Sequence, residues 1–414
     1  MSSSIYSHLG GLFRKSSKPS ATASAAAVTI NSSQQTASEP TRLTAAATKE
    51  KQLESLVKKF KKNSESPRFR RRHLNYEPAV RRLASAGRLS SIHDILNHQK
   101  QYKDITNERF TVRLLWLYGK SQMSDHALDL FEEMPQLNCL RTVLSFNALL
   151  AACVHSKQFD KTVKLFREIP EKLAIQPDIV SYNTVIKAFC ELGSLDTAVS
   201  MMDELDKNGI HATSATFNTL LYAFYKSGRF DEAEKIWGLM EKKNVSADAR
   251  SYNAKLHGLV KDKRVMEAVG VVEGMEDRGV KPDGVSYNVL IKGFVDEGHS
   301  NEVKRWYKKM IDNECTLDLA TFRMLIPFAC DTGDIDFAHE LCKKSIDENR
   351  IYIKGILRVI NKLVEQSKIN EAKELMELGS SIRVLREKLS TQTQGMEAIG
   401  CHHNSEEEEP SLQD

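Results

Sequence analysis

The stretch Gly279-Val-Lys-Pro-Asp-Gly-Val-Ser-Tyr-Asn-Val-Leu-Ile-Lys-Gly-Phe294 decides the fold, because its pair of an aromatic residue and a polar residue recurs along the chain. The recurring pairs are Phe146-Asn147, Tyr182-Asn183, Phe217-Asn218, Tyr252-Asn253, Tyr287-Asn288 and Phe322-Arg323, at successive spacings of 36, 35, 35, 35 and 35 residues. An apolar pair follows most of them, and a Gly then follows at a constant offset, as at Gly193, Gly228, Gly298 and Gly333. A period between about 20 and 50 residues is the signature of a repeat architecture.

A second helical pattern begins after each Gly, for example at Leu195-Asp-Thr-Ala198, Phe230-Asp-Glu-Ala233 and Ile335-Asp-Phe-Ala338. Its apolar residues recur at spacings of three and four, as one buried helix face requires. Each unit is therefore predicted to be a helical hairpin. A lone hairpin cannot bury its apolar face, so neighbouring hairpins must stack and share one continuous core. The sequence predicts an all-α solenoid of about nine hairpins.

The repeat register divides the chain into four parts. Residues 1–50 are expected to be an organelle transit peptide, 51–72 a basic segment, 73–387 the repeat array and 388–414 a polar, acidic tail. The expected repeats are 73–107, 108–142, 143–178, 179–213, 214–248, 249–283, 284–318, 319–352 and 353–387.

The first 50 residues have the composition of a targeting segment. They are rich in Ser, Ala and Thr, contain Arg14, Lys15, Lys18 and Arg42, and reach their first acidic residue at Glu39. Mitochondrial and chloroplast transit peptides have this composition. The spread of the arginines favours the mitochondrion, with the chloroplast as the alternative. A polar tail without a targeting role is the other interpretation.

The net charge of +4 is unevenly distributed. Residues 1–50 carry 5 Lys and Arg against 2 Asp and Glu, residues 51–82 carry 11 against 3, and residues 83–414 carry 43 against 50. Most of the chain is therefore mildly acidic. Nucleic-acid binding would have to depend on a local face or on the basic stretch from Lys58 to Arg82.

Signatures of catalysis and of metal binding are missing from the sequence. It contains no HExxH, GxxxxGK[ST] or GxGxxG motif, and Gly119-Lys120-Ser121 lacks the first Gly of a phosphate loop. Its 7 cysteines form no CxxC pair, and we interpret Cys401-His402-His403 as part of a solvated tail. No run of 18 apolar residues occurs. We expect a binding protein with no catalytic residue, metal, cofactor, small-molecule substrate or membrane contact.

The units Ile179-Val-Ser-Tyr-Asn-Thr-Val-Ile-Lys-Ala-Phe-Cys190 and Gly279 to Phe294 resemble the pentatricopeptide repeat family. The resemblance covers about three quarters of the chain. Its uniform repeat length resembles that of the P-type subclass. The chain is also similar to the short plant mitochondrial members of the family, some of which join the mitochondrial ribosome. It implies a right-handed superhelix. Residues 388–414 do not resemble the deaminase-like or nuclease-like extensions that some relatives carry.

The resemblance also implies that each repeat reads one RNA base with its fifth residue and its last residue. The implied pairs are Asn147/Asp178, Asn183/Thr213, Asn218/Asp248, Asn253/Asp283 and Asn288/Asp318. In the family pattern, an Asn/Asp pair reads uracil. The Asn/Thr pair departs from that pattern, and we expect it to accept either pyrimidine. An Asn carboxamide offers both a donor and an acceptor to a base edge.

Two further positions follow from the resemblance. Val180 and Val285 match the second position, which wedges between neighbouring bases in the family, whereas Ala215 and Arg250 depart from it. Lys226 and Lys261 match a phosphate-contacting Lys near the end of the first helix. Glu191, Asp296 and Asp331 occupy the equivalent places in other repeats, which predicts modest RNA affinity.

A structural interpretation of the same residues stays open. Each Asp precedes a helix start, where a carboxylate caps unpaired backbone N–H groups. Capping explains the Asn residues less well, because Asn is a mediocre helix former inside a first turn. If the Asn side chains only face the groove, their replacement by Ala is expected to leave stability nearly unchanged.

Two functions are consistent with these observations. The first is an RNA-binding protein of mitochondrial RNA metabolism or translation, with a short, pyrimidine-rich single-stranded target. The second is a structural subunit of the mitochondrial ribosome that binds rRNA and ribosomal proteins.

Overall fold

The computed structural model describes residues 40–380, and within that range every regular element is a helix. The prediction of an all-α fold is therefore confirmed. The chain separates into two compact units, residues 1–59 and residues 60–414. The described part of the first unit is the beginning of α2 (Pro40–Ser64), and the hairpins belong to the second unit. None of the helices between residues 40 and 380 combines the length and apolarity needed to cross a membrane.

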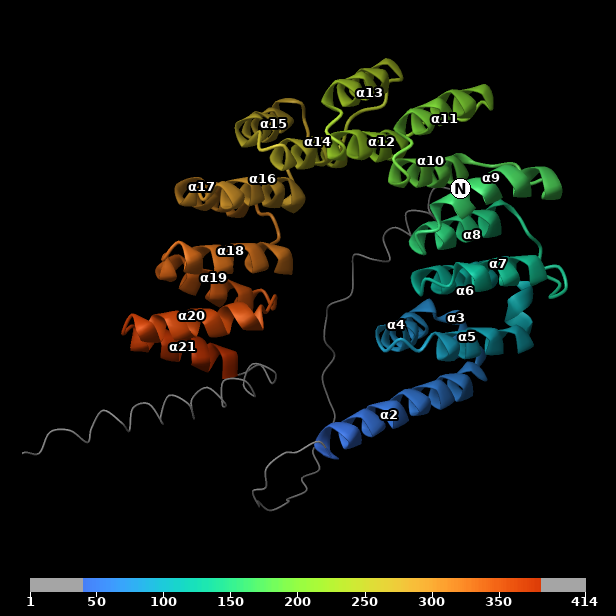
Figure 1. Ribbon diagram of the computed structural model, residues 1–414, viewed down its shortest axis with the longest axis horizontal. Coiled ribbons are helices and arrows are strands. Elements are labelled where there is room, and N and C mark those ends of the chain that lie inside the picture. The colour runs from blue at the N-terminus through green and yellow to red at the C-terminus, as the bar shows by residue number, and fades with distance from the viewer. Residues whose placement is uncertain (1–39, 381–414) are drawn as a thin grey trace, which may run out of the picture. The chain divides into compact units, whose positions relative to one another are not determined.

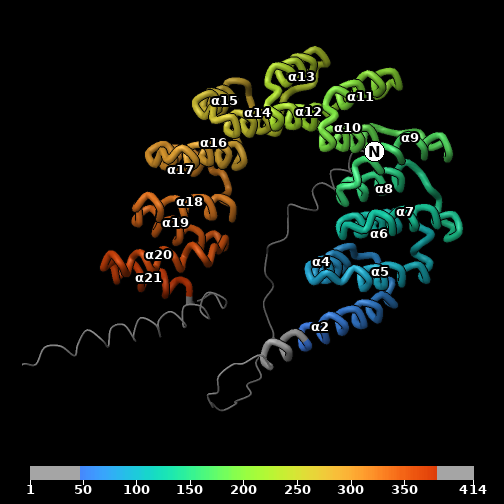
Figure 2. Tube along the Cα trace, viewed as in Figure 1, coloured from blue at the N-terminus to red at the C-terminus, as the bar shows by residue number. Residues whose placement is uncertain are grey.

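The second unit is a succession of helical hairpins that follow one another in chain order (Figures 1 and 2). Their first helices are α4 (Glu77–Ser85), α6 (Glu108–Lys120), α8 (Val143–His155), α10 (Ile179–Glu191), α12 (Ser214–Lys226), α14 (Ala249–Lys261), α16 (Gly284–Glu297), α18 (Leu319–Asp331) and α20 (Ile353–Glu365). Their second helices are α5 (Leu89–Asn97), α7 (Ser124–Glu133), α9 (Phe159–Leu173), α11 (Leu195–Lys207), α13 (Phe230–Lys242), α15 (Val265–Asp277), α17 (Ser300–Asp312), α19 (Ile335–Asp347) and α21 (Ile369–Ser380).

Each hairpin turn depends on a residue with positive φ. Gly193, Gly228, Gly298 and Gly333 have φ between 76° and 79°, a left-handed conformation that Gly adopts without a steric penalty. In other hairpins Lys157 and Lys263 take the same place with φ of 58° and 60°. The four Gly positions noted in the sequence therefore follow the first helix of their own hairpins, and other residues with positive φ do so elsewhere.

The core lies where first helices stack on one another and on their second helices. Each first helix contacts the next first helix from α6 through α20. The aromatic residues of the recurring pairs lie in this core, with exposed fractions of 0% for Phe146, Phe217 and Phe322, and 2% for Tyr287. The backbones approach closely at Gly258, where a Cβ atom would lie 2.7 Å from the Cβ of Tyr225. The periodic aromatic is therefore a packing residue.

Part of the N-terminal basic stretch is folded into helices and contributes to packing. The helix α2 runs without interruption across the expected boundary between residues 50 and 51 and is followed by α3 (Pro67–Arg71). Within that stretch, Arg70 is buried and its guanidinium forms a 2.8 Å ion pair with Asp104. Arg70 Nη1 also donates to the backbone carbonyls of Ser64 and Glu65. Three 3₁₀ turns, His73–Asn75, His98–Gln101 and Lys103–Thr106, complete this end of the array.

Several predictions concern residues outside the described range. They are the transit peptide before residue 40, the end of the last repeat after residue 380, the tail 388–414 and the Cys401-His402-His403 sequence.

Candidate nucleic-acid interface

The five predicted Asn residues occupy one structural position. Each is the fifth residue of a first helix, in α8, α10, α12, α14 and α16. Since these helices contact one another in succession, the Asn residues form a row along the stack. The residues of this row are Asn147, Asn183, Asn218, Asn253 and Asn288.

The Asn residue of one repeat bonds to the helix start of the next. Asn253 Nδ2 donates to Asp283 Oδ1 at 3.1 Å, and Ser286 Oγ donates to Asn253 Oδ1 at 2.7 Å. Asp283 Oδ1 also accepts the backbone N–H groups of Val285 and Ser286, both at 3.0 Å, and so caps α16. Burial alone would raise the pKa of Asp283, but these hydrogen bonds to its charged form lower the pKa below its usual value.

The same arrangement recurs at two other repeat junctions. Asn147 Nδ2 donates to Asp178 Oδ1 at 2.9 Å, and Asn218 Nδ2 donates to Asp248 Oδ1 at 3.0 Å. At both junctions a Ser hydroxyl donates back to the Asn carbonyl: Ser181 at 2.5 Å and Ser251 at 2.6 Å. In three of the predicted pairs the two members are therefore directly bonded.

In the two remaining pairs a Thr hydroxyl joins the members. Thr321 Oγ1 donates to Asn288 Oδ1 at 3.0 Å and to Asp318 Oδ1 at 3.0 Å. Thr216 Oγ1 donates to Asn183 Oδ1 at 2.7 Å and lies 3.4 Å from Thr213 Oγ1. The structure thus brings together all five predicted pairs.

Capping and base reading are compatible in this geometry. Each Asp caps a helix, and Asp178, Asp248 and Asp283 also accept a hydrogen bond that orients an Asn carboxamide. A carboxamide has two N–H donors and two acceptor lone pairs. The bonds to Asp and to Ser engage one donor and one acceptor, so the group retains the capacity to pair with a base edge.

Two of the Asn residues are more deeply buried than the sequence led us to expect. The exposed fraction is 4% for Asn147 and 7% for Asn253. This burial favours a contribution of these two side chains to stability, whereas a purely groove-facing Asn is expected to contribute little. Both carboxamides bond to the Asp and Ser of the following repeat, as that of the only partly buried Asn218 also does.

The other predicted site residues differ in their surroundings. Val285 is 44% exposed, and Val180 is partly buried. Lys226 is exposed, and its Nζ lies 5.6 Å from the centre of the Tyr222 ring. Lys261 Nζ donates to the backbone carbonyl of Lys226 at 2.6 Å, at the C-terminus of α12, where a cation also meets the negative end of the helix dipole.

An open hollow of about 740 Å³ surrounds one predicted pair. Val285, Asn288 and Asp318 line it, as the sequence predicts for a base site. Residues that sequence reasoning missed also line it, among them His257, Lys292 and Arg323. Burial lowers the pKa of His257 below its usual value, so its imidazole is neutral at neutral pH.

The missed residues have a periodic signal of their own. Lys187, Tyr222, His257 and Lys292 each stand four residues after an Asn of the row and are 35 residues apart. Residues four apart lie on the same face of a helix, so the row and these side chains share a face. Tyr222 is 44% exposed, and its ring lies 6.3 Å from that of His257 in an edge-to-face arrangement.

A group of basic residues extends the interface toward the N-terminus. Burial, together with the charges of Lys120 and Lys187, lowers the pKa of His155 to about 4. Burial and Lys187 also lower the pKa of Lys120. Lys120 and His155 are the last residues of α6 and α8, as Lys226 is of α12. We missed Lys120 because its repeat lacks the aromatic–Asn pair, and His155 because a His stands there in place of the expected Lys.

Two of the acidic residues that predicted weak phosphate binding have cationic partners. Asp331 Oδ1 accepts from Arg358 Nη2 at 2.5 Å, and Asp296 forms an ion pair with Lys292 one turn earlier in the same helix. These pairs reduce the repulsion that the acidic residues would exert on a phosphate.

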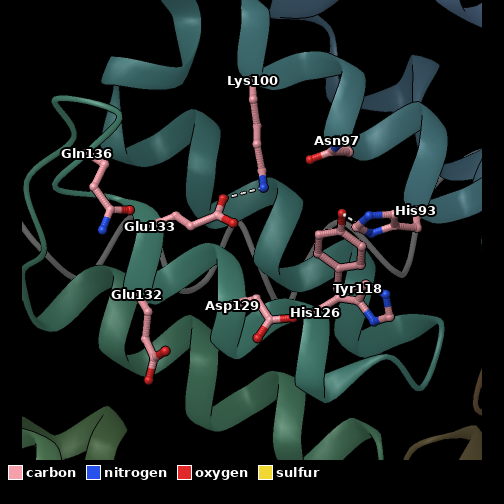
Figure 3. Close-up of a pocket in the computed structure, with 9 residues that line it drawn as sticks. All are labelled: His93, Asn97, Lys100, Tyr118, His126, Asp129, Glu132, Glu133 and Gln136. Atoms are coloured by element: carbon pink, nitrogen blue, oxygen red, sulfur yellow. Dashed lines mark hydrogen bonds and ion pairs between the residues drawn. The ribbon is translucent and has the colours of Figure 1, made fainter.

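A second hollow, of about 620 Å³, lies between α5, α6 and α7 (Figure 3). The rings of His93 and His126 lie 4.5 Å apart, Tyr118 Oη lies 3.2 Å from His93 Nδ1, and Lys100 forms an ion pair with Glu133. Burial and the neighbouring His126 lower the pKa of His93. In the part of the chain that the structure describes, no three His, Cys, Asp or Glu side chains are placed to hold a metal ion.

Two models of known protein families match the sequence. The model described as the PPR repeat family matches residues 177–226, 212–260, 247–296 and 282–331. The model described as the PPR repeat matches residues 113–139 and 144–172. Together these matches span just over half of the chain.

Individual proteins match shorter stretches. Small ribosomal subunit protein mS78 (rPPR3a) of Arabidopsis thaliana is 50% identical over 184 residues, which are 42% of this chain and 46% of that protein. Pentatricopeptide repeat-containing protein At2g18520, mitochondrial, of the same plant is 39% identical over 160 residues, 38% of each protein. The chain thus spans less than half the length of these curated relatives. Among solved structures, the pentatricopeptide repeat protein PPR10 from maize matches 77% of this chain and 55% of its own at 15% identity and a TM-score of 0.42.

Proposed function

Because this chain belongs to the pentatricopeptide repeat family, we propose that it binds single-stranded RNA in an organelle through its row of Asn residues. The observation that carries the proposal is the recurrence of one hydrogen-bonded arrangement at successive repeats. At all five positions a Ser or Thr of the next repeat donates to the carboxamide, and at three of them the carboxamide also donates to the Asp that caps the next helix. Packing alone does not require the same amide at one position in five repeats.

The preferred RNA is a short run of pyrimidines, and uridine above all. Four of the five pairs combine Asn with Asp, and the fifth combines Asn with Thr. The second-position side chains Val180 and Val285 support neighbouring bases, while Lys226 and Lys261 contact phosphates. This assignment combines the family pattern with the hollow that contains Asn288 and Asp318. The role is binding, without catalysis.

A binding assay on the full chain tests this proposal. Fluorescence anisotropy at fixed salt is used to compare labelled 10-nucleotide oligouridine with oligoadenosine. We expect a lower Kd for oligouridine, and we expect the joint variant of Asn218→Ala, Asn253→Ala and Asn288→Ala to lose the preference. Salt must be held constant, because phosphate contacts make every affinity salt-dependent. Equal affinity of the unaltered chain for both oligonucleotides would refute base reading.

A structural role in the mitochondrial ribosome is the second candidate. The similarity to mS78, named as a small ribosomal subunit protein, supports it, and the similarity to At2g18520 supports a mitochondrial location. In this role the array binds rRNA and ribosomal proteins. Sedimentation of the tagged protein from mitochondria, with and without RNase, separates the two roles. A subunit sediments with ribosomal particles, whereas a free RNA-binding protein does not.

A further inference from the structure

We propose that a second row of side chains, Lys187, Tyr222, His257 and Lys292, binds the sugar–phosphate backbone of the RNA. The inference rests on the proposed function, because it concerns the strand whose bases the Asn row would read. It assigns a role to residues outside the predicted pairs. We call this set the ninth-position row, since each member is the ninth residue of its first helix.

Shared placement is the first argument. His257 and Lys292 line the same hollow as Asn288 and Asp318. A strand bound in that hollow would meet both the reading pair and these two side chains. The 35-residue spacing repeats this relation from α10 through α16.

The second argument is the geometry of one helix. Along α12, Asn218, Tyr222 and Lys226 are successively four residues apart, so the first and last lie about 12 Å apart along the axis. If Asn218 holds the base edge and Lys226 meets a phosphate, Tyr222 lies between them, where the ribose connects the two. A nucleotide spans the same three groups in the same order.

The chemistry of the row suits this task. Tyr222 is an aromatic surface that is 44% exposed, with the Lys226 ammonium on one side and the His257 ring on another. A ring that packs against the ribose gives affinity without base preference, comparable to the sequence-tolerant stacking on aromatic rings in other single-strand-binding grooves. Lys187 lies close enough to Lys120 for its positive charge to lower the pKa of that lysine. Its charge complements the phosphates of RNA.

The two lysines differ in a way that can be tested. Lys292 forms an ion pair with Asp296, so a phosphate must compete with that carboxylate. Removal of the competitor by Asp296→Asn is therefore expected to lower the Kd for RNA, and Lys292→Ala to raise it. Neither change involves an Asn of the reading row.

The experiment measures affinity, base preference and salt dependence of the full chain together. Tyr222→Ala is expected to raise the Kd about tenfold for oligouridine and oligoadenosine alike, whereas Tyr222→Phe retains most of the affinity. Joint replacement of Lys187 and Lys292 by Ala is expected to reduce the slope of log K against log salt by about 0.7 for each lysine. Met266→Ala, which removes a 73% exposed side chain from the second helix α15, is the matched control and should change nothing.

The outcomes separate this inference from the proposed function. A chain that prefers oligouridine but is unaffected by Tyr222→Ala and by the lysine replacements overturns the ninth-position row and leaves base reading intact. A loss of base preference in Tyr222→Ala also overturns it, because a backbone contact cannot discriminate between bases. A chain that binds neither oligonucleotide overturns both proposals.

Discussion

The carboxamide of Asn253 links two repeats, and its removal is the most direct test of the interface geometry. Asn253→Ala deletes the bond to Asp283 at 3.1 Å and the bond from Ser286 at 2.7 Å. A hydrogen bond between neutral groups contributes about 0.5–1.5 kcal/mol, and one to a charged group about 1.5–3 kcal/mol. The sum of about 2–4.5 kcal/mol is an upper bound.

Two effects reduce the loss. Ser286 Oγ still donates to Asp283 Oδ1 at 3.1 Å, and Asp283 still accepts from the backbone N–H groups that it caps. Neither partner is therefore left without a hydrogen bond. Ala also exceeds Asn in helix propensity by roughly 0.7 kcal/mol or less. We therefore expect Asn253→Ala to destabilise the array by about 1–2 kcal/mol.

Urea unfolding followed by circular dichroism measures the effect, and hydrogen exchange at the amides of Val285 and Ser286 locates it. Asn183→Ala is the matched control: its carbonyl accepts one bond from Thr216, and its paired cap residue, Thr213, carries no charge. We expect the control to lose less stability than Asn253→Ala. Equal losses in the two variants, or no loss at Asn253, would refute the linkage of repeats through the carboxamide.

Three other changes follow from the structure. Ala233 is fully buried, so the larger side chain of Ala233→Trp should overpack the core, destabilise the array by about 1–3 kcal/mol and lower its melting temperature. An unchanged melting curve would contradict the placement of Ala233 in the core. The depressed pKa of His155, about 4 in the folded chain against 6.5 for a free His, means that its neutral form contributes stability above pH 6.5 that is progressively lost toward pH 4, and solvent around this exposed side chain keeps that contribution small. His155→Gln should remove this part of the pH dependence, which melting temperatures between pH 7 and pH 4 would reveal. Finally, import should remove roughly the first 25–50 residues; N-terminal sequencing of the organelle form checks this, and an intact Met1 would contradict it.

The repeating pattern determined the fold class and which residues meet at the junctions between repeats. An aromatic every 35 residues, an apolar helix face and a Gly between two helices are local features, and each has one physical interpretation. The pattern also located Asn253 and Asp283, because the same residue types recur at one register. Local chemistry was enough to predict that Asp283 caps a helix.

Tertiary structure decided how those residues are used. Asn253 is 7% exposed and donates to the Asp that caps the next helix, a contact that depends on two repeats at once. Arg70 is likewise buried against Asp104, which lies 34 residues away, so membership of a basic stretch did not make it a surface cation. The surroundings of Tyr222 also depend on a neighbouring helix, because its ring contacts that of His257. Periodicity specifies which face of a helix a residue occupies, but burial and partnership are properties of the stacked neighbours, and these exist only once the chain has folded.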